Sequence, residues 1–185
     1  MTETKKLVTF DEELFYDIET SWAWLLQILQ HNNIYSELFF DCVKKIMTKS
    51  SMKINTLWLK SKSNAGKSLI CNSIGRSCRF YVTLNEFDDK TQFPLNDAPL
   101  QCVLFINEPE VSARRVELLK NGMEGQENAI NVKNEKGVIL PRVPWLIASN
   151  HDIWEYCPEE KTALLNRCYP FDLSLLTRAV PCGQS

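Results

Sequence analysis

The first fifty residues carry apolar side chains at intervals of three and four positions. This spacing places apolar side chains on one face of an α-helix, with polar residues opposite. Two such stripes occur, one with Phe15, Ile18, Trp22, Leu25 and Leu29, the other with Phe39, Cys42, Val43 and Ile46. The pattern predicts a small N-terminal helical region over residues 1–52. Its apolar stripes either pack inside the chain or contact another subunit.

Beyond residue 52 the pattern changes to short apolar runs of strand length. Five runs are strand candidates, and helical spacing lies between some of them: strands at 56–59, 79–82, 102–106, 143–148 and 169–173, helices at 66–74 and 111–119. Short buried strands that alternate with helices are typical of an α/β domain with a mainly parallel sheet. We therefore expect a three-layer α/β core with a mainly parallel five-stranded sheet over residues 53–178, including a hairpin at 129–140. Residues 179–185 are expected to form a tail.

Composition narrows the class of protein. The chain has 185 residues, of which 44% are hydrophobic, and a formal net charge of −2. A chain of this length can bury a real core, and its charge excludes a histone-like DNA binder, so nucleic acid would need a local basic patch. Seven scattered cysteines and only two histidines argue against a zinc site and for reduced thiols. With no visible signal peptide or membrane-length apolar run, we expect an intracellular protein without a membrane partner.

The strongest chemical signal is the segment Ser61-Lys62-Ser63-Asn64-Ala65-Gly66-Lys67-Ser68, called the phosphate loop below. It joins a predicted strand to a predicted helix, where backbone N–H groups make a fixed anion site. Residues 63–68 would surround the phosphates of a nucleotide. Lys67 would reach the β- and γ-phosphates, and Ser68 would ligate Mg²⁺. Ser61 stands where such loops usually have glycine, so its backbone must have an ordinary φ or tolerate strain.

Two further strands end in polar residues. Asn107 and Glu108 follow the third predicted strand, and Asn150 follows the fourth. Because ligands gather at the carboxyl ends of parallel strands, Glu108 is a candidate to polarise water or to hold Mg²⁺, and Asn150 to contact the γ-phosphate. Asn107 occupies a place where a carboxylate is expected, which would weaken Mg²⁺ binding. Glu108 also fits a helix start that favours acids, and Asn150 a simple turn.

The ordered motifs resemble the superfamily 3 helicase domain of parvovirus non-structural proteins, with the densovirus branch as the softer likeness. The likeness runs from about Leu57 to Leu173. Its parts are 63–68 as Walker A, 80–97 with Phe93-Pro94-Leu95-Asn96-Asp97, 103–108 as Walker B, Gly125-Gln126 with Lys133 and Lys136 as the B-prime motif, 143–150 as motif C and Leu165-Asn166-Arg167 as the arginine-finger stretch.

The resemblance implies an AAA+-like core that assembles as a ring, usually a hexamer, with ATP between subunits and single-stranded DNA in the channel. It implies that Arg167 enters the neighbouring subunit's nucleotide site, and that Lys133 and Lys136 contact DNA phosphates. From the residues alone, Arg167 also fits a surface or salt-bridged arginine, and the lysines an ordinary solvated hairpin. The implied location is the host nucleus, or elsewhere inside the cell.

The leading hypothesis is therefore an ATP-dependent DNA helicase or ATPase motor domain of a viral replication initiator, using ATP and Mg²⁺. The chain is expected to be an excised domain or a naturally short gene, because no nuclease motif appears in it. The departures at Ser61 and Asn107 leave an alternative open. In that alternative, the chain is a weakened or co-opted fragment that binds nucleotide or partners without turnover. A monomeric nucleotide-binding switch is a third hypothesis.

Overall fold

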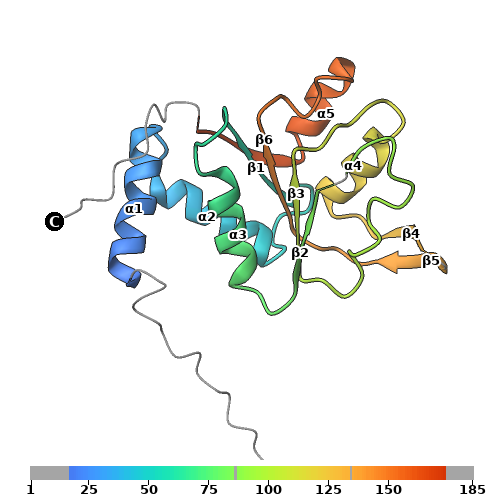
Figure 1. Cartoon of the computed structure of the whole chain (residues 1–185), viewed down its shortest axis with the longest axis horizontal. Helices are drawn as coiled ribbons and strands as arrows, with labels where there is room; N and C mark the ends of the chain where they lie inside the picture. The colour runs from blue at the N-terminus through green and yellow to red at the C-terminus, as the bar shows by residue number, and fades with distance from the viewer. Residues whose placement is uncertain (1–16, 86, 134, 174–185) are drawn as a thin grey trace, which may run out of the picture.

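The five-stranded sheet forms the centre of the molecule. The structure is a computed structural model that describes residues 17–85, 87–133 and 135–173, without the side chains of residues 135 and 136. The strands stand in the order β2-β3-β6-β1-β7 and all run parallel (Figure 1). They are β1 Thr56–Lys60, β2 Tyr81–Leu84, β3 Val103–Asn107, β6 Trp145–Ser149 and β7 Cys168–Asp172. The predicted α/β class and five-stranded sheet are confirmed.

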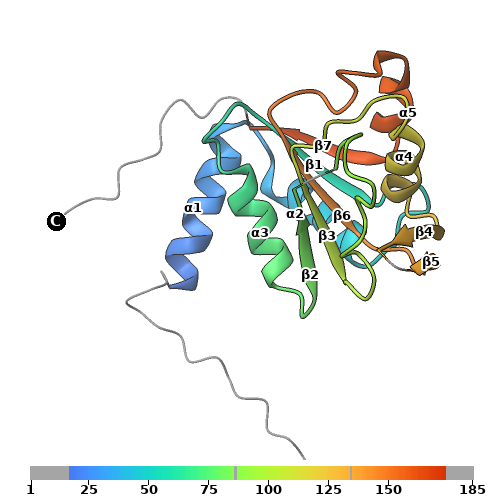
Figure 2. The ribbon, with the colours of Figure 1, turned by 45° about the vertical axis from the view of Figure 1, so that its right-hand side comes forward.

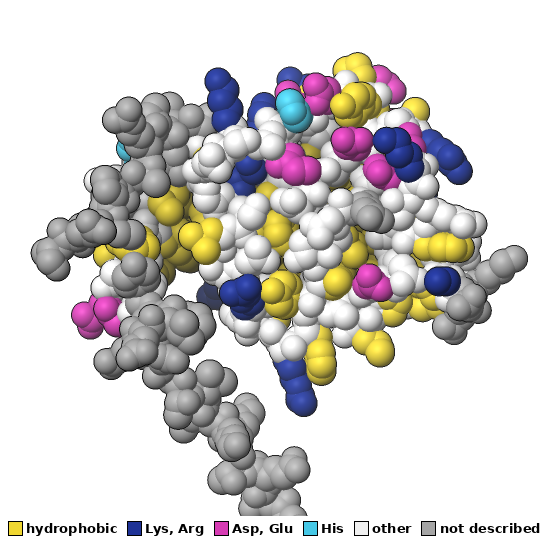
Figure 3. Space-filling model, viewed as in Figure 1, with side chains coloured by type: hydrophobic (Ala, Val, Ile, Leu, Met, Phe, Trp, Pro, Cys, Tyr) yellow, Lys and Arg dark blue, Asp and Glu magenta, His cyan; other side chains and the backbone are white. Residues whose placement is uncertain are grey.

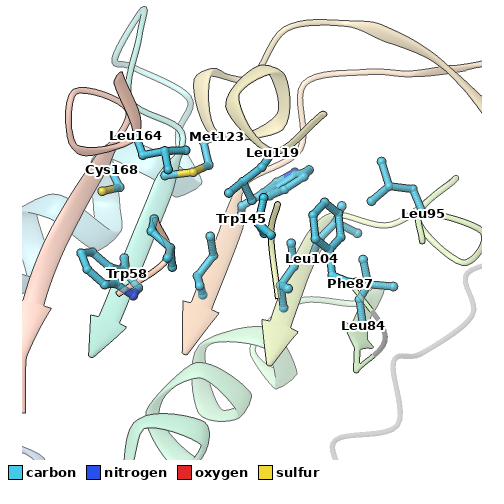
Figure 4. Packing of buried hydrophobic residues seen from close by; sticks show 14 of the residues in the cluster. Trp58, Leu84, Phe87, Leu95, Leu104, Leu119, Met123, Trp145, Leu164 and Cys168 are labelled. Atoms are coloured by element: carbon cyan, nitrogen blue, oxygen red, sulfur yellow. The ribbon is translucent and has the colours of Figure 1, made fainter. Parts of the chain in front are cut away.

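Alternating side chains of the strands enter two separate cores. On β1, Leu57 and Leu59 face one core and Trp58 faces the other, as the period of two in a strand requires. The first core is covered by α1 Ile18–His31, α2 Ser36–Met47 and α3 Lys67–Arg76, the second by α4 Val116–Glu124 and α5 Lys161–Leu165 (Figures 2 and 4). Helices on both faces of the sheet make the expected three layers.

The two N-terminal helices differ in how far they are buried: α2 packs three side chains into the core, whereas α1 buries only Leu29. Leu29 on α1 and Phe39, Cys42 and Ile46 on α2 are buried in the core that also holds Leu57. Near the start of α1, however, Ile18 and Trp22 are exposed, and Trp22 stacks on Phe40 at a ring-centroid distance of 4.8 Å. Packing within the chain therefore accounts for the second stripe and for the later part of the first, at Leu25 and Leu29, but not for exposed Ile18. The predicted position Phe15 and the predicted tail at 179–185 lie outside the described residues.

The helix α1 begins after Asp17, whose carboxylate accepts a hydrogen bond from the Thr20 N–H at 2.7 Å. This is a normal N-terminal cap, because the first N–H groups of a helix have no partner within the helix. Hydrogen bonding to Thr20 also lowers the pKa of the Asp17 carboxyl. The Asp17 cap therefore fixes the start of α1 at Ile18.

Several element boundaries differ from the predictions. The predicted helix at 111–119 begins only at Val116, because Val111 is buried in a loop whose Ser112 bridges to Tyr156. β2 and β6 each start two residues later than predicted, at Tyr81 and Trp145. The short helices η1 Pro158–Glu160 and α5 were not predicted, since five or fewer residues carry too little periodicity. The hairpin is present, with β4 Asn128–Val132 and β5 Glu135–Leu140 as a separate two-stranded sheet.

Candidate functional site

Three polar segments meet at the carboxyl edge of the sheet, where β1, β6 and β3 end side by side. The phosphate loop follows β1, Glu108 follows β3 and Asn150 follows β6. Lys67, the first residue of α3, donates through Nζ to Asn150 Oδ1 at 2.8 Å and lies 4.0 Å from Glu108 Oε1. The fold thus gathers Lys67, Glu108 and Asn150 from positions far apart in the sequence.

The Lys67 ammonium is enclosed by the phosphate loop itself. Its side chain is only 6% exposed, and Nζ also donates to the carbonyl oxygens of Ser61 at 3.1 Å and Lys62 at 3.4 Å. Burial lowers the pKa of Lys67, and the nearby Glu108 charge opposes that shift. Carbonyl oxygens are neutral acceptors, so an anionic phosphate oxygen would be a stronger partner for the same donor.

Glu108 is held in an uncommon backbone conformation. Its φ is 50°, in the left-handed region, which costs about 1–3 kcal/mol for a residue other than glycine. Two hydrogen bonds fix it there: the Glu108 N–H donates to Ala148 O at 2.8 Å, and the carboxylate accepts from the Asn150 N–H at 2.7 Å. In this conformation the carboxylate points toward Asn150 and Lys67.

Ser68 and Asn107 face each other on the other side of the loop. The Ser68 hydroxyl donates to Asn107 Oδ1 at 3.4 Å. Hydroxyl, amide and carboxylate oxygens suit Mg²⁺, which keeps most of its waters and takes one or two protein ligands plus phosphate oxygens. Ser68 therefore fits the role of a direct ligand, with Asn107 or Glu108 acting through water. The described residues contain no cluster of three or more His, Cys, Asp or Glu side chains that would hold a metal alone.

The backbone of the phosphate loop explains why serine is tolerated at position 61. The left-handed residues of the loop are Asn64, with φ 67°, and Gly66, with φ 83°. Ser61 is not among them; it is buried, its N–H donates to Ser149 O at 3.2 Å and its hydroxyl to Lys62 O at 2.8 Å. Asparagine adopts this region more readily than most residues. The positive φ angles of the loop therefore occur at an asparagine and a glycine, and Ser61 does not need one.

Residues 4–156 match the family described as parvovirus non-structural protein NS1. The chain belongs to this family. The phosphate loop, Glu108, Asn150 and the hairpin all lie inside the matched residues, whereas Arg167 lies beyond them.

Two named relatives align with most of the chain at 26–30% identity over the aligned residues. Initiator protein NS1 of human parvovirus B19 is 30% identical over 170 residues, covering 84% of this chain and 25% of that protein. Protein Rep52 of adeno-associated virus 2 is 26% identical over 133 residues, covering 69% of this chain and 33% of that protein. The chain therefore spans only a quarter to a third of the length of these two relatives.

Solved structures show the same fold. The C-terminal region of NrS-1 superposes with a TM-score of 0.58 at 14% identity, covering 85% of this chain and 39% of that one. A ligand-bound JCV helicase superposes with a TM-score of 0.52 at 11% identity, covering 71% of this chain and 39% of that one. This NS1-family chain thus shares its fold with both solved structures.

Arg167 lies at the opposite, amino edge of the sheet. Its Nε and Nη2 atoms both lie 2.9 Å from Glu124 Oε2, and Nη1 donates to Ala163 O at 2.6 Å. Thr56 pairs with Cys168 in the parallel register of β1 and β7, so Arg167 is level with Asn55, and Ser61 lies about 20 Å away at 3.3 Å per strand residue. Arg167 does not reach the phosphate loop of its own chain.

The hairpin lysines differ in what the structure describes. Lys133 is exposed at the turn, and its N–H donates to Asn96 Oδ1 at 2.9 Å, which ties the hairpin to the segment between β2 and β3. The side chain of Lys136 lies outside the described part of the chain. On the face shown in Figure 3, Lys and Arg side chains are interspersed with Asp and Glu side chains. This face therefore has no broad basic surface, and Lys133 supplies only a local positive charge at the hairpin turn.

A polar cavity of about 320 Å³ opens beside the candidate site. Lys60, Asn150, Asp152 and Trp154 are among the residues that line it, and Lys60 Nζ lies 2.5 Å from Asp152 Oδ1. The sequence did not single out this ion pair, because Lys60 and Asp152 become neighbours only when β1 and β6 pair. A larger groove of about 420 Å³ lies between α1 and α2 and contains no phosphate-loop residue.

No helix in the described ranges is both long and apolar enough to cross a membrane.

Proposed function

We propose that the chain is the ATP-hydrolysing motor domain of a viral replication initiator, and that it couples hydrolysis to movement on single-stranded DNA. One observation carries this proposal: Lys67, Glu108 and Asn150 converge at the carboxyl ends of three adjacent parallel strands. Open α/β sheets bind ligands at this edge. Membership in the NS1 family, whose named relatives are initiator proteins, supports the same conclusion.

In the proposed reaction each residue has a separate task. Lys67 leaves the carbonyl oxygens of its own loop and binds the β- and γ-phosphates, while residues 63–68 surround them with backbone N–H groups. Ser68 ligates Mg²⁺, which would supply charge neutralisation on the phosphates. Glu108 orients the attacking water and draws its proton, and Asn150 positions the γ-phosphate or that water.

Arg167 would complete the site of a neighbouring subunit in a ring, usually a hexamer. Its distance from its own phosphate loop supports action between subunits over action within one. Its ion pair with Glu124 means that it must exchange a carboxylate for a phosphate when it does so. Lys133 and Lys136 would contact the DNA backbone in the channel, since phosphate contacts need a cation and no base readout. Work on viral DNA would place the protein in the host nucleus.

A second candidate function has one observation in its favour. Asn107, and not a carboxylate, faces Ser68. An amide adds no negative charge, so it holds Mg²⁺ less firmly than a carboxylate does. In this alternative the chain binds nucleotide, turns it over slowly or not at all, and acts by joining rings of related subunits.

The first test measures Mg²⁺-dependent ATP binding and hydrolysis separately, against increasing concentrations of single-stranded DNA, in the full chain. Hydrolysis that rises with DNA supports the motor. Binding without hydrolysis supports the second candidate. A folded chain that binds no nucleotide would overturn both.

The second test mixes two variants, Lys67→Ala and Arg167→Ala. Each alone is expected to be inactive. If Arg167 acts between subunits, a mixture restores part of the activity, because Arg167→Ala subunits keep an intact phosphate loop and receive Arg167 from Lys67→Ala neighbours. A mixture as inactive as its components, in rings shown to contain both variants, would exclude action between subunits.

A further inference from the structure

One buried amide joins both ends of the hairpin to the strand that leads to the phosphate loop. Asn55, which directly precedes β1, is 0% exposed. Its Nδ2 donates to Gly122 O at 3.1 Å and to Val143 O at 2.6 Å, and its Oδ1 accepts from Arg142 Nε at 3.2 Å. Gly122 lies before the hairpin in the chain, while Arg142 and Val143 lie after it. We call these residues, with Gly125, the hairpin clasp.

The main chain of Asn55 repeats the same connection. Its N–H donates to Met123 O at 3.0 Å, at the end of α4, and its carbonyl accepts from the Trp145 N–H at 2.9 Å, at the start of β6. Side chain and backbone of one residue thus bind both segments that flank the hairpin.

Arg142 extends the clasp to the segment that precedes β1. Besides contacting Asn55, its guanidinium donates to Ser51 O at 2.5 Å and to Met52 O at 3.4 Å. A side chain at position 125 would break this arrangement, because an added Cβ on Gly125 would lie 2.8 Å from Asn55 Cγ and 2.8 Å from Arg142 Nε. Gly125, with φ 78°, therefore lets α4 end directly against the clasp. This gives the Gly125-Gln126 motif a physical reason.

A purely structural role would be to satisfy the last carbonyls of α4, which lack partners inside the helix. Asn55 does more than this, because it also binds Val143 and Arg142, which follow the hairpin in the chain. The hairpin forms its own two-stranded sheet, outside the hydrogen-bonded ladder of the five strands. Between Asn55 and Ser61 lies only β1, whose residues Thr56–Leu59 are buried and packed on both faces. Packed elements of this kind move as units.

We propose that Asn55 and Arg142 are positioning residues that carry the effect of DNA bound at the hairpin to the phosphate loop of the same chain. This inference rests on the proposed motor function. The hairpin is the moving part, the clasp is its pivot, and β1 is the rigid connection. Loss of the clasp should leave the nucleotide site intact, since none of its residues touches Lys67, Glu108 or Asn150, and should remove the response to DNA.

The test uses Arg142→Lys and Arg142→Ala in the full chain, with Arg114→Ala as the control that removes an exposed arginine outside the clasp. Asn55→Asp is an additional variant, which keeps the acceptor for Arg142 and loses the Nδ2 donor. Hydrogen exchange of backbone amides is measured in the hairpin and in α3, with and without Mg²⁺ and ATP. Because Arg142 is only half-buried, its variants stay informative even if the buried Asn55→Asp variant fails to fold.

Nucleotide should change amide exchange in the hairpin of the wild-type chain, and this change should be lost in both Arg142 variants and kept in Arg114→Ala. ATP affinity and hydrolysis without DNA should stay within about twofold, while stimulation by single-stranded DNA falls at least about fivefold. If the Arg142 variants loosen the hairpin but keep its response to nucleotide and DNA, the clasp is only structural and the inference is overturned. Nucleotide binding that leaves hairpin exchange unchanged in the wild type overturns the inference alone. A wild type that binds no nucleotide removes the proposed function together with the coupling.

Discussion

The two edges of the sheet are built from different kinds of interaction. At the carboxyl edge, Glu108 and Asn150 follow strand ends and Lys67 begins α3, and their donors and charges are directed at one another and at neutral carbonyls. At the amino edge, buried Asn55 has each side-chain polar atom hydrogen-bonded, and Arg167 is paired with Glu124. At the carboxyl edge, charged and polar side chains are available to a ligand. At the amino edge, such side chains are paired with other groups of the chain. Apart from the proposed roles of Arg167 between subunits and of the clasp in the response to DNA, substitutions should therefore lower ATP turnover at the carboxyl edge and folding stability at the amino edge.

The largest expected effect is at the carboxyl edge. Lys67→Ala should lower ATP hydrolysis about 100- to 1,000-fold, because it removes a charge that stabilises the phosphates in a water-poor site. The free energy of unfolding should change little, because the variant loses the hydrogen bonds of the ammonium but also avoids the cost of removing that ammonium from water. Lys62→Ala, at an exposed position of the same loop, is the control and should stay near wild type. The measurements are phosphate release and thermal unfolding of both variants. A Lys67→Ala variant whose main defect is low stability would contradict the comparison.

The next effect is at the amino edge. In Gly122→Ala, the added Cβ would lie 1.9 Å from Cζ2 of the Trp145 ring, which is itself 1% exposed. We expect a loss of about 3 kcal/mol in the free energy of unfolding, at the upper end of overpacking effects. Gly137→Ala meets no atom within 4 Å and has only the cost of a φ of 69°, about 1 kcal/mol. Urea unfolding of both variants measures the difference, and equal losses would show that Trp145 can move aside.

A matched pair of substitutions compares the edges directly. Glu124→Gln should lower the free energy of unfolding by about 1 kcal/mol, because it weakens a largely buried ion pair with Arg167. Glu108→Gln should alter stability by less than about 0.5 kcal/mol, since its partner Lys67 keeps other acceptors. Glu108→Gln should instead lower hydrolysis at least about tenfold. The opposite result, with Glu108 important for folding and Glu124 dispensable, would break the comparison.

The last effect, which is absent near neutral pH and appears only above pH 9, should be the same on both faces of the sheet. Burial raises the pKa of the Cys71 and Cys168 thiols to about 12, from an ordinary value of 9.0. The folded state therefore keeps these protons longer than the unfolded state. Their contribution is fully present below pH 9 and is lost as the pH rises toward 12, with a slope of at most about 1.4 kcal/mol per pH unit for each thiol.

Unfolding of Cys71→Ala and Cys168→Ala should accordingly show a weaker loss of stability above pH 9 than the wild type. Cys102→Ala removes an exposed thiol and serves as the control. The measurement is urea unfolding at a series of pH values from 8 upward. A slope that is unchanged in both variants would mean that other groups control the alkaline transition.

Periodicity alone predicted most of the fold because its signal is local. Short apolar runs identified the five parallel strands, and intervals of three and four identified α1 and α2. Local pattern failed where a long-range contact decided the outcome. Val111 looked helical, but its burial in a loop bridged to Tyr156 delays α4 to Val116.

The sequence by itself determined the residues of the carboxyl edge. A strand followed by Gly66, Lys67 and Ser68, and later strands followed by Glu108 and Asn150, identify a candidate site because parallel strands must end together. Whether these residues act as proposed stays a prediction.

Only the tertiary structure decided the amino edge. Asn55 precedes a strand, as many asparagines do, and nothing local indicates that its partner Val143 lies 88 positions away. The sequence likewise left open whether Arg167 pairs within the chain, which its contact with Glu124 answers for the isolated subunit. The physical reason is that a strand end is specified by neighbouring residues, whereas the partner of a buried amide or a half-buried arginine depends on which distant segments the sheet order brings together.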